Sequence, residues 1–246
     1  MSDQFTKKKA MVSWTGGKDC ALSLFMARQS GFEIAGLVTF IPAGSNFRAH
    51  PLNVIEKQAE ALNLPWTKIV IENPYPQFYE LSLEKIKLMY DIDCLITGDI
   101  DLIDNFPTNY MEDRCKAVGL NIFNPIWQKS RDEIWELLFE NNFEVIFSFS
   151  KADLLSAEWI GKRITKEIFT EFKKAVHANG IDLCGENGEF HSIVIDSPNF
   201  DRKLMLKSFR IISEDNFNYL KIEEVSLHII PPMDQPLKAE HRSLFK

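Results

Sequence analysis

The stretch AMVSWTGGKDC, residues 10–20, decides the fold of this chain. Its first four residues are apolar enough to form a short strand, and Gly16-Gly17 predicts a tight turn after that strand. From Asp19 to Gln29 the apolar side chains recur at helical spacing. The stretch therefore predicts a strand, a glycine turn and a helix in direct succession.

Three properties make this turn a candidate phosphate site. Because glycine has no Cβ, successive backbone N–H groups can approach one phosphate. The helix directs the positive end of its dipole at the same place, and Lys18 adds a mobile charge. Thr15 and Ser13 add hydroxyl groups. The adjacent glycines exclude a Walker A loop, which needs four residues between its glycines. A strand-to-helix turn without a ligand remains the alternative.

Working outward, the first half of the chain alternates strand and helix patterns. The expected strands are Ala10 to Ser13, Ile34 to Ile41, Lys68 to Ile71 and Asp93 to Thr97, and the expected helices are Asp19 to Gln29, Leu52 to Leu62, Pro76 to Tyr90 and Tyr110 to Val118. This alternation predicts an α/β fold, a Rossmann-like parallel sheet with helices on both faces. Ligands of such sheets bind beyond the carboxyl ends of the strands. The loops 13–19, 39–50 and 98–105 are therefore expected to converge on one site.

The second half predicts a smaller α+β domain. The expected elements are a helix from Ser130 to Asn141, a strand from Phe143 to Phe149, one long helix carrying Ile160, Ile164, Ile168, Phe172 and Val176, a strand from His191 to Asp196, and a short antiparallel pair within Lys203 to Ile230. We expect an ATP-binding domain over residues 1–125, a substrate-binding domain over residues 126–232 and a loose tail over residues 233–246.

Composition and charge argue against several functional classes for this chain. The 246-residue chain has a formal net charge of −7, so it lacks the positive field of non-specific nucleic-acid binders, and no nucleic-acid partner is expected. Neither a signal-peptide core nor a membrane-spanning apolar run is visible, which predicts a cytoplasmic protein. The four cysteines form no CxxC pair that would suggest zinc. The many aromatic side chains are expected in the core and at a homodimer interface.

The segment from Ser13 to Cys20 resembles the SGGKDS signature of the PP-loop ATP pyrophosphatases, which belong to the adenine-nucleotide α-hydrolase-like superfamily. Thr15 takes the place of the first serine and keeps its hydroxyl group. Cys20 takes the place of the last serine, and a thiol is a weaker hydrogen-bonding group. The resemblance implies cleavage of ATP between its α and β phosphates.

The segment from Gly185 to His191, GENGEFH, is the second unusual motif. Its two carboxylates, its amide and its two glycines suit an ammonium group, a metal or a cationic substrate, and they equally suit a solvated turn. Followed by a strand, and together with Gly98-Asp99 and QAEALNLPW (residues 58–66), it resembles the diphthine–ammonia ligase family, also called diphthamide synthetase. Tyr110 and Ser192 depart from the arginine and the threonine that are usual there.

This second resemblance implies an ATP-dependent amide synthesis. A substrate carboxylate would attack the α-phosphorus of ATP and release pyrophosphate, and ammonia would then displace AMP. ATP and Mg²⁺ are the implied cofactors. In organisms that make diphthamide, the implied acceptor is a modified histidine of elongation factor 2, which carries a trimethylated ammonium group.

The resemblance also implies roles for individual residues. Lys18 and Asp19 would be catalytic, and Asp19 and Asp99 would hold Mg²⁺. The implied ATP-binding residues are Ser13, Trp14, Thr15, Gly16, Gly17, Lys18, Asp19, Cys20, Val38, Thr39, Phe40, Gly98 and Asp99. The implied substrate-binding residues are Gly185, Glu186, Asn187, Gly188, Glu189, Phe190 and His191.

Two other functions remain open at this point. A PP-loop tRNA sulfur transferase needs a reactive cysteine, and Cys20 lies at a helix N-terminus, which favours the thiolate. A sensor that binds ATP or AMP without turnover would account for the departures at Cys20 and Tyr110.

Overall fold

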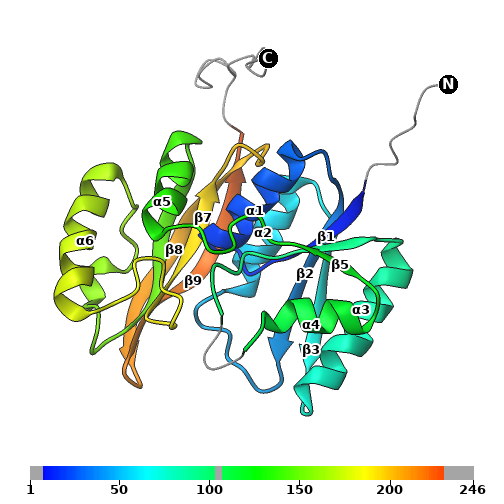
Figure 1. The fold of residues 1–246 in the computed structure, drawn as a ribbon. Helices are drawn as coiled ribbons and strands as arrows, with labels where there is room; N and C mark the ends of the chain where they lie inside the picture. Colours follow the sequence, from blue (N-terminus) through cyan, green and yellow to red (C-terminus); the bar gives the residue numbers. More distant parts are fainter. Residues whose placement is uncertain (1–7, 103–106, 230–246) are drawn as a thin grey trace, which may run out of the picture.

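The computed structural model describes residues 8–102 and 107–229 of the chain. Its first sheet has five strands in the order β3-β2-β1-β4-β5, and every neighbouring pair is parallel (Figure 1). The strands are β1 (Lys9–Ser13), β2 (Glu33–Pro42), β3 (Trp66–Ile71), β4 (Cys94–Ile96) and β5 (Asn121–Phe123). The expected Rossmann-like sheet is thereby confirmed. The sequence patterns missed only β5, which has three residues and is too short to show a period.

Helices cover both faces of this sheet. They are α1 (Lys18–Gln29), α2 (Leu52–Leu62), α3 (Tyr75–Tyr90) and α4 (Tyr110–Ala117). Along β1, Ala10 and Val12 belong to the core cluster that contains side chains of α1 and α2, whereas Met11 belongs to the cluster that contains side chains of α3 and α4. Alternate side chains of the strand therefore enter two different apolar layers, as a parallel sheet buried on both faces requires.

The second sheet is antiparallel, with the order β7-β6-β9-β8. Its strands are β6 (Glu144–Lys151), β7 (Phe190–Asp196), β8 (Lys203–Glu214) and β9 (Phe217–His228), and the helices α5 (Arg131–Glu140) and α6 (Lys166–Asn179) accompany it. The expected smaller α+β unit is confirmed. The antiparallel pair near the end is longer than expected, because β8 and β9 have 12 residues each and pair along their length.

The long helix expected from Ile160 onward is wrong in its first part, because α6 begins at Lys166. Thr165 caps it by accepting a hydrogen bond from the backbone N–H of Ile168 at 3.3 Å. Ile164 lies in an extended segment whose N–H donates to the Val145 carbonyl at 2.8 Å. Ile160 and Ile164 are buried by contact with the sheet instead, so a four-residue spacing imitated a helix here.

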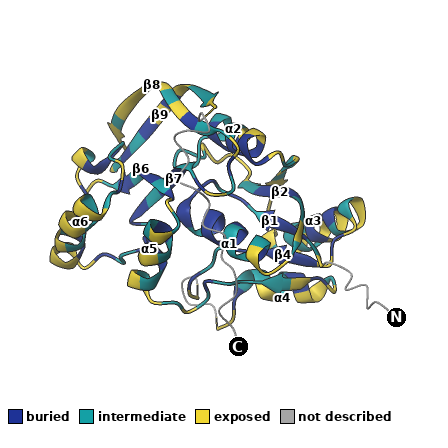
Figure 2. Ribbon diagram, turned by 90° about the horizontal axis from the view of Figure 1, so that it is seen from above, coloured by how far each residue is buried: buried dark blue, intermediate teal, exposed yellow. Residues whose placement is uncertain are grey.

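Helix α1 joins the two sheets. Figure 2 shows it buried between them, and its residues share one core cluster with strands β6 and β7. The boundary expected near residue 125 falls between β5 and α5, and the division into domains stays a prediction. The expected loose tail, residues 233–246, lies outside the described residues. Within the described ranges, no helix combines the length and apolarity that a membrane crossing needs.

Candidate active site

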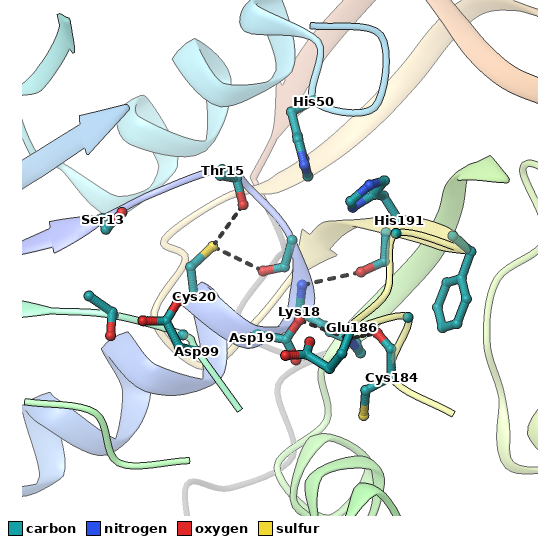
Figure 3. A pocket seen from close by; sticks show the side chains of 17 residues that line it. Ser13, Thr15, Lys18, Asp19, Cys20, His50, Asp99, Cys184, Glu186 and His191 are labelled. Carbon is teal, nitrogen blue, oxygen red and sulfur yellow. Dashed lines mark hydrogen bonds and ion pairs between the residues drawn. The ribbon is translucent and has the colours of Figure 1, made fainter. Parts of the chain in front are cut away.

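A cavity of about 390 Å³ lies where the carboxyl ends of β1 and β4 face strand β7 (Figure 3). Most of the expected site residues line it: Ser13, Thr15, Gly17, Lys18, Asp19, Cys20, Gly98, Asp99, Gly185, Glu186, Gly188, Phe190 and His191. Other expected residues do not line this cavity: Trp14, Gly16, Val38, Thr39, Phe40, Asn187 and Glu189. The two motifs, far apart in the chain, therefore open on one space.

The glycine turn leads directly into the first turn of α1. Gly17 is the N-cap and supplies no side chain to the first turn of the helix, whose N–H groups lack intrahelical partners. The backbone N–H of Lys18 donates to the Ser192 hydroxyl at 3.3 Å. Gly98 lets β4 approach closely, since a Cβ there would lie 2.6 Å from the Cys20 nitrogen. The turn is thus open toward the cavity, and it is contacted by Ser192 on one side and by the Gly98 backbone on the other.

Lys18 connects the two halves of the site. Its side chain is 2% exposed, and its Nζ donates to Asp19 Oδ2 at 2.8 Å and to the Cys184 carbonyl at 2.7 Å. Burial alone would lower the pKa of Lys18, but the Asp19 carboxylate and neighbouring negative charges raise it above its ordinary value. The ammonium group therefore stays charged beside the turn.

Three carboxyl groups line the cavity, those of Asp19, Asp99 and Glu186. Burial, together with the charge of Asp19, raises the pKa of Asp99 and brings that of Glu186 to about 7. Asp19 Oδ1 is buried without a hydrogen-bond partner among the described residues. Asp99 Oδ2 accepts from Asn109 at 3.2 Å. Such crowding of carboxylates suits a cation that would relieve their repulsion.

The carboxylates fit Mg²⁺, which needs only one or two of them plus phosphate oxygens. The free oxygen of Asp19 is the observation that supports this fit. No cluster of three or more His, Cys, Asp or Glu side chains suited to a metal occurs in the described part of the chain.

The GENGEFH turn is held together by Glu189. This side chain is 5% exposed, and it accepts from the N–H groups of Asp182 at 3.0 Å and Asn187 at 2.9 Å. Asn187 also donates its amide to Glu189 at 3.1 Å. These two side chains bond to the turn itself and do not line the cavity. Glu186 and His191 point toward it (Figure 3).

Two family models match the chain, diphthamide synthase N-terminal domain over residues 8–122 and diphthamide synthase C-terminal domain over residues 130–227. The chain belongs to the diphthamide synthase family. As a member it is an enzyme of the C–N ligase class. Proteins named diphthine–ammonia ligase from Bos taurus and Homo sapiens are each 23% identical to it, over 89% of this chain and 91% of theirs. That of Schizosaccharomyces pombe is 24% identical, over 85% of this chain and 38% of its own length.

Among solved structures, a predicted subunit of tRNA methyltransferase from Methanocaldococcus jannaschii is similar to this family member with a TM-score of 0.44 and 15% identity. The similarity covers 77% of this chain and 98% of that one.

Sequence reasoning missed four lining residues of this diphthamide synthase site: His50, Thr97, Cys184 and Ser192. His50 and His191 face each other with ring centroids 4.8 Å apart (Figure 3). Burial lowers the pKa of His50 to about 3 and that of His191 to about 4, so both imidazoles are neutral near pH 7. The position of His50 at the end of the loop after β2 was the available signal.

Val38, Thr39 and Phe40, which were expected to bind ATP, lie in β2 and do not line the cavity. The Thr39 hydroxyl donates to the Trp14 carbonyl at 2.6 Å and accepts from the Trp66 indole at 2.8 Å. The Val38 carbonyl accepts from the Trp14 N–H at 2.8 Å. These groups brace the entry into the glycine turn.

Cys20 is not the thiolate that its position at a helix N-terminus suggests. Its Sγ donates to the Gly17 carbonyl at 3.2 Å, and burial raises the pKa of the thiol. Burial also raises the pKa of Cys94 to about 11 and those of Cys115 and Cys184 to about 12. All four cysteines are free and buried. Cys20 and Cys184 line the cavity, but their raised pKa values disfavour the thiolate that persulfide chemistry needs.

Proposed function

We propose that this diphthamide synthase family member joins ammonia to a substrate carboxylate at the expense of ATP, with AMP and pyrophosphate as products. The convergence of the two motifs carries the proposal. The phosphate-binding turn and the GENGEFH turn open on one cavity, and Lys18 Nζ spans them through its bond to the Cys184 carbonyl. ATP and the carboxylate substrate can therefore meet beside the ammonium group of Lys18.

The chemistry proceeds in two displacements. An oxygen of the substrate carboxylate bonds to the α-phosphorus of ATP, the bond to the oxygen bridging to the β-phosphorus breaks, and pyrophosphate leaves with the electron pair. The ammonia nitrogen then bonds to the acyl carbon, AMP leaves with the electrons of the carbon–oxygen bond, and the nitrogen gives up a proton to water. No protein nucleophile is needed.

The protein's part is to bind and orient. The N–H groups at the start of α1 and the ammonium group of Lys18 would hold the leaving pyrophosphate, which stabilises the charge that develops there. Mg²⁺, bound through Asp19 and Asp99, would neutralise further phosphate charge. The buried Thr97 hydroxyl lines the cavity beside the Asp99 carboxylate, within reach of a ligand bound there.

The acceptor would approach from a second cavity of about 460 Å³, which shares His50 and His191 with the first. Phe47, Phe149 and Phe217 line it beside the two uncharged imidazoles. A rim charge of this cavity, Arg48, pairs with Asp215 at 3.1 Å and Glu214 at 3.5 Å. An aromatic wall of this kind accommodates a cationic group on the acceptor, such as the modified histidine of an elongation factor.

The test is a product analysis. The protein is incubated with Mg-ATP, ammonium chloride and elongation factor 2 that carries the unamidated modified histidine, and the nucleotides are separated by chromatography. AMP is expected to form only with all substrates present, in an amount equal to the amidated acceptor, whereas pyrophosphate release needs only ATP and the acceptor. ADP and phosphate as products would refute cleavage at the α-phosphorus. Tight ATP binding without AMP would favour the sensor.

A further inference from the structure

Gln58 lies on α2 with its side chain in direct contact with the glycine turn. The side chain is fully buried, and all of its polar atoms are bonded. Its Oε1 accepts from the Trp14 indole N–H at 3.0 Å, and its Nε2 donates to the Gly16 carbonyl at 2.9 Å and to the Val194 carbonyl at 2.8 Å. One amide thus connects the end of β1, the turn and strand β7.

The same peptide of the turn is held from the other sheet. The Gly16 carbonyl also accepts from the Val194 N–H at 3.0 Å. Gly16 has a φ of +81°, and a Cβ at this position would lie 2.4 Å from Gln58 Oε1. The carbonyl of Gly16 is therefore fixed on the side away from the cavity, toward α2 and β7. The N–H groups that follow it, those of Gly17 and Lys18, are placed at the start of α1.

We propose that Gln58 is a positioning residue for the triphosphate. It touches no reacting atom. By bonding to Gly16 and Val194 at once, it sets the orientation of the turn and makes that orientation depend on strand β7, which also carries His191 and Ser192 into the cavity. A phosphate site on the first sheet is therefore completed by the second. The inference rests on the proposed function, because it needs a nucleotide at the turn.

A buried amide also stabilises the fold in general, so the test needs a matched control. Asn218 on β9 is 4% exposed. Its Nδ2 donates to the Ser150 hydroxyl at 3.3 Å and to the Leu155 carbonyl at 3.1 Å, and its Oδ1 accepts from Ser213 at 2.7 Å. It lines neither cavity. Gln58→Met and Asn218→Leu each remove a buried amide of the same bonding pattern while nearly conserving volume.

The experiment is calorimetric titration with α,β-methylene-ATP and Mg²⁺, at a temperature where every variant is folded by circular dichroism. Both variants are expected to melt below the wild type. Gln58→Met is expected to raise the Kd for the analogue at least tenfold, equivalent to about 1.4 kcal/mol, and Asn218→Leu to leave it within about twofold. Gln58→Glu, which keeps the acceptor for Trp14 but loses both donors, is expected to weaken binding as well and serves if Gln58→Met does not fold.

A Gln58→Met or Gln58→Glu protein that binds the analogue as tightly as Asn218→Leu would overturn the inference and leave the proposed function standing. A wild-type protein that binds no analogue would overturn both. Hydrogen exchange in the peptide of residues 13–20 adds an independent measure, because a released turn exchanges faster in the Gln58 variants than in the Asn218 variant.

Discussion

Replacing Lys18 by methionine removes both the proposed contact of this side chain with phosphate and its ion pair with Asp19, and comparison with Asp19→Asn tells the two apart. Methionine keeps the length and the apolar stem of lysine and removes only the ammonium group. The Asp19 carboxylate then loses its partner at 2.8 Å, and the Cys184 carbonyl loses its donor at 2.7 Å. A negative charge without its counter-ion remains in a cavity that already holds Asp99 and Glu186.

The expected loss of stability follows from the burial of the pair. Removing one partner of a fully buried ion pair costs about 3–5 kcal/mol. The Asp19 side chain is 24% exposed, so solvent relieves part of this cost and about 2 kcal/mol is expected. For a chain of this size that corresponds to a fall in Tm of roughly 4–8 °C. Loss of a charge-assisted bond to phosphate, about 1.5–3 kcal/mol, weakens nucleotide binding roughly 10- to 150-fold.

The assay compares Lys18→Met, Asp19→Asn and the double variant by thermal unfolding and by AMP formation. Because the double variant carries no unpaired carboxylate at this position, its Tm is expected to lie above that of Lys18→Met. AMP formation is expected to stay lost in both variants, since neither has the ammonium group. A Lys18→Met protein with an unchanged Tm, or a double variant whose losses simply add, would refute the ion-pair reasoning. Undiminished AMP formation would remove the turn from the mechanism.

Three further predictions concern the same cavity. Because burial raises the pKa of Glu186 from 4.5 to about 7, the folded protein binds this proton more tightly than the unfolded chain, and stability falls as pH rises through that window. Glu186→Gln should therefore raise Tm at pH 8 relative to the wild type, with no gain at pH 4; equal shifts at both pH values would contradict this. Gly98→Ala should lower both Tm and the affinity for ATP, because its Cβ would meet the Cys20 nitrogen. Both are measured by calorimetry, and unchanged values would show that the backbone after β4 can move away from α1. Replacing all four cysteines by serine or alanine should leave amide formation intact, and its loss with retained Tm would show that a thiol takes part in the reaction.

Much of the site was predictable because it depends on local geometry. The strand, the Gly-Gly turn and the helix follow one another within a few residues, and the turn opens on the cavity as expected. The segment from Val38 to Phe40 shows the limit of such reasoning. It lies within β2 and does not line the cavity, and the bonds of Thr39 to Trp14 and Trp66 attach it to the entry of the turn. Its part in ATP binding stays a prediction.

Side-chain roles within GENGEFH could not be predicted, because they depend on which way each residue faces. Glu186 and Glu189 have the same chemistry and lie three residues apart. Glu189 is turned inward, where the N–H groups of Asp182 and Asn187 hold it. Glu186 faces the cavity and gains a pKa of about 7. In the same way, the spacing of the isoleucines before α6 predicted a helix. The chain is extended there because it hydrogen-bonds to β6.

The sequence by itself determined the parallel sheet and the glycine turn between β1 and α1, because hydrophobic periodicity and glycine geometry act over a few residues. The kind of chemistry came from the resemblance of two motifs to a known family. Only the tertiary structure decided that the glycine turn is held in place by hydrogen bonds from α2 and from a strand of the second sheet. Gln58 and Val194 reach Gly16 from positions 42 and 178 residues further along the chain, and the Lys18 ammonium group bonds to the Cys184 carbonyl. Hydrogen bonds across such separations form only after the core around α1 has closed, so no local pattern encodes them.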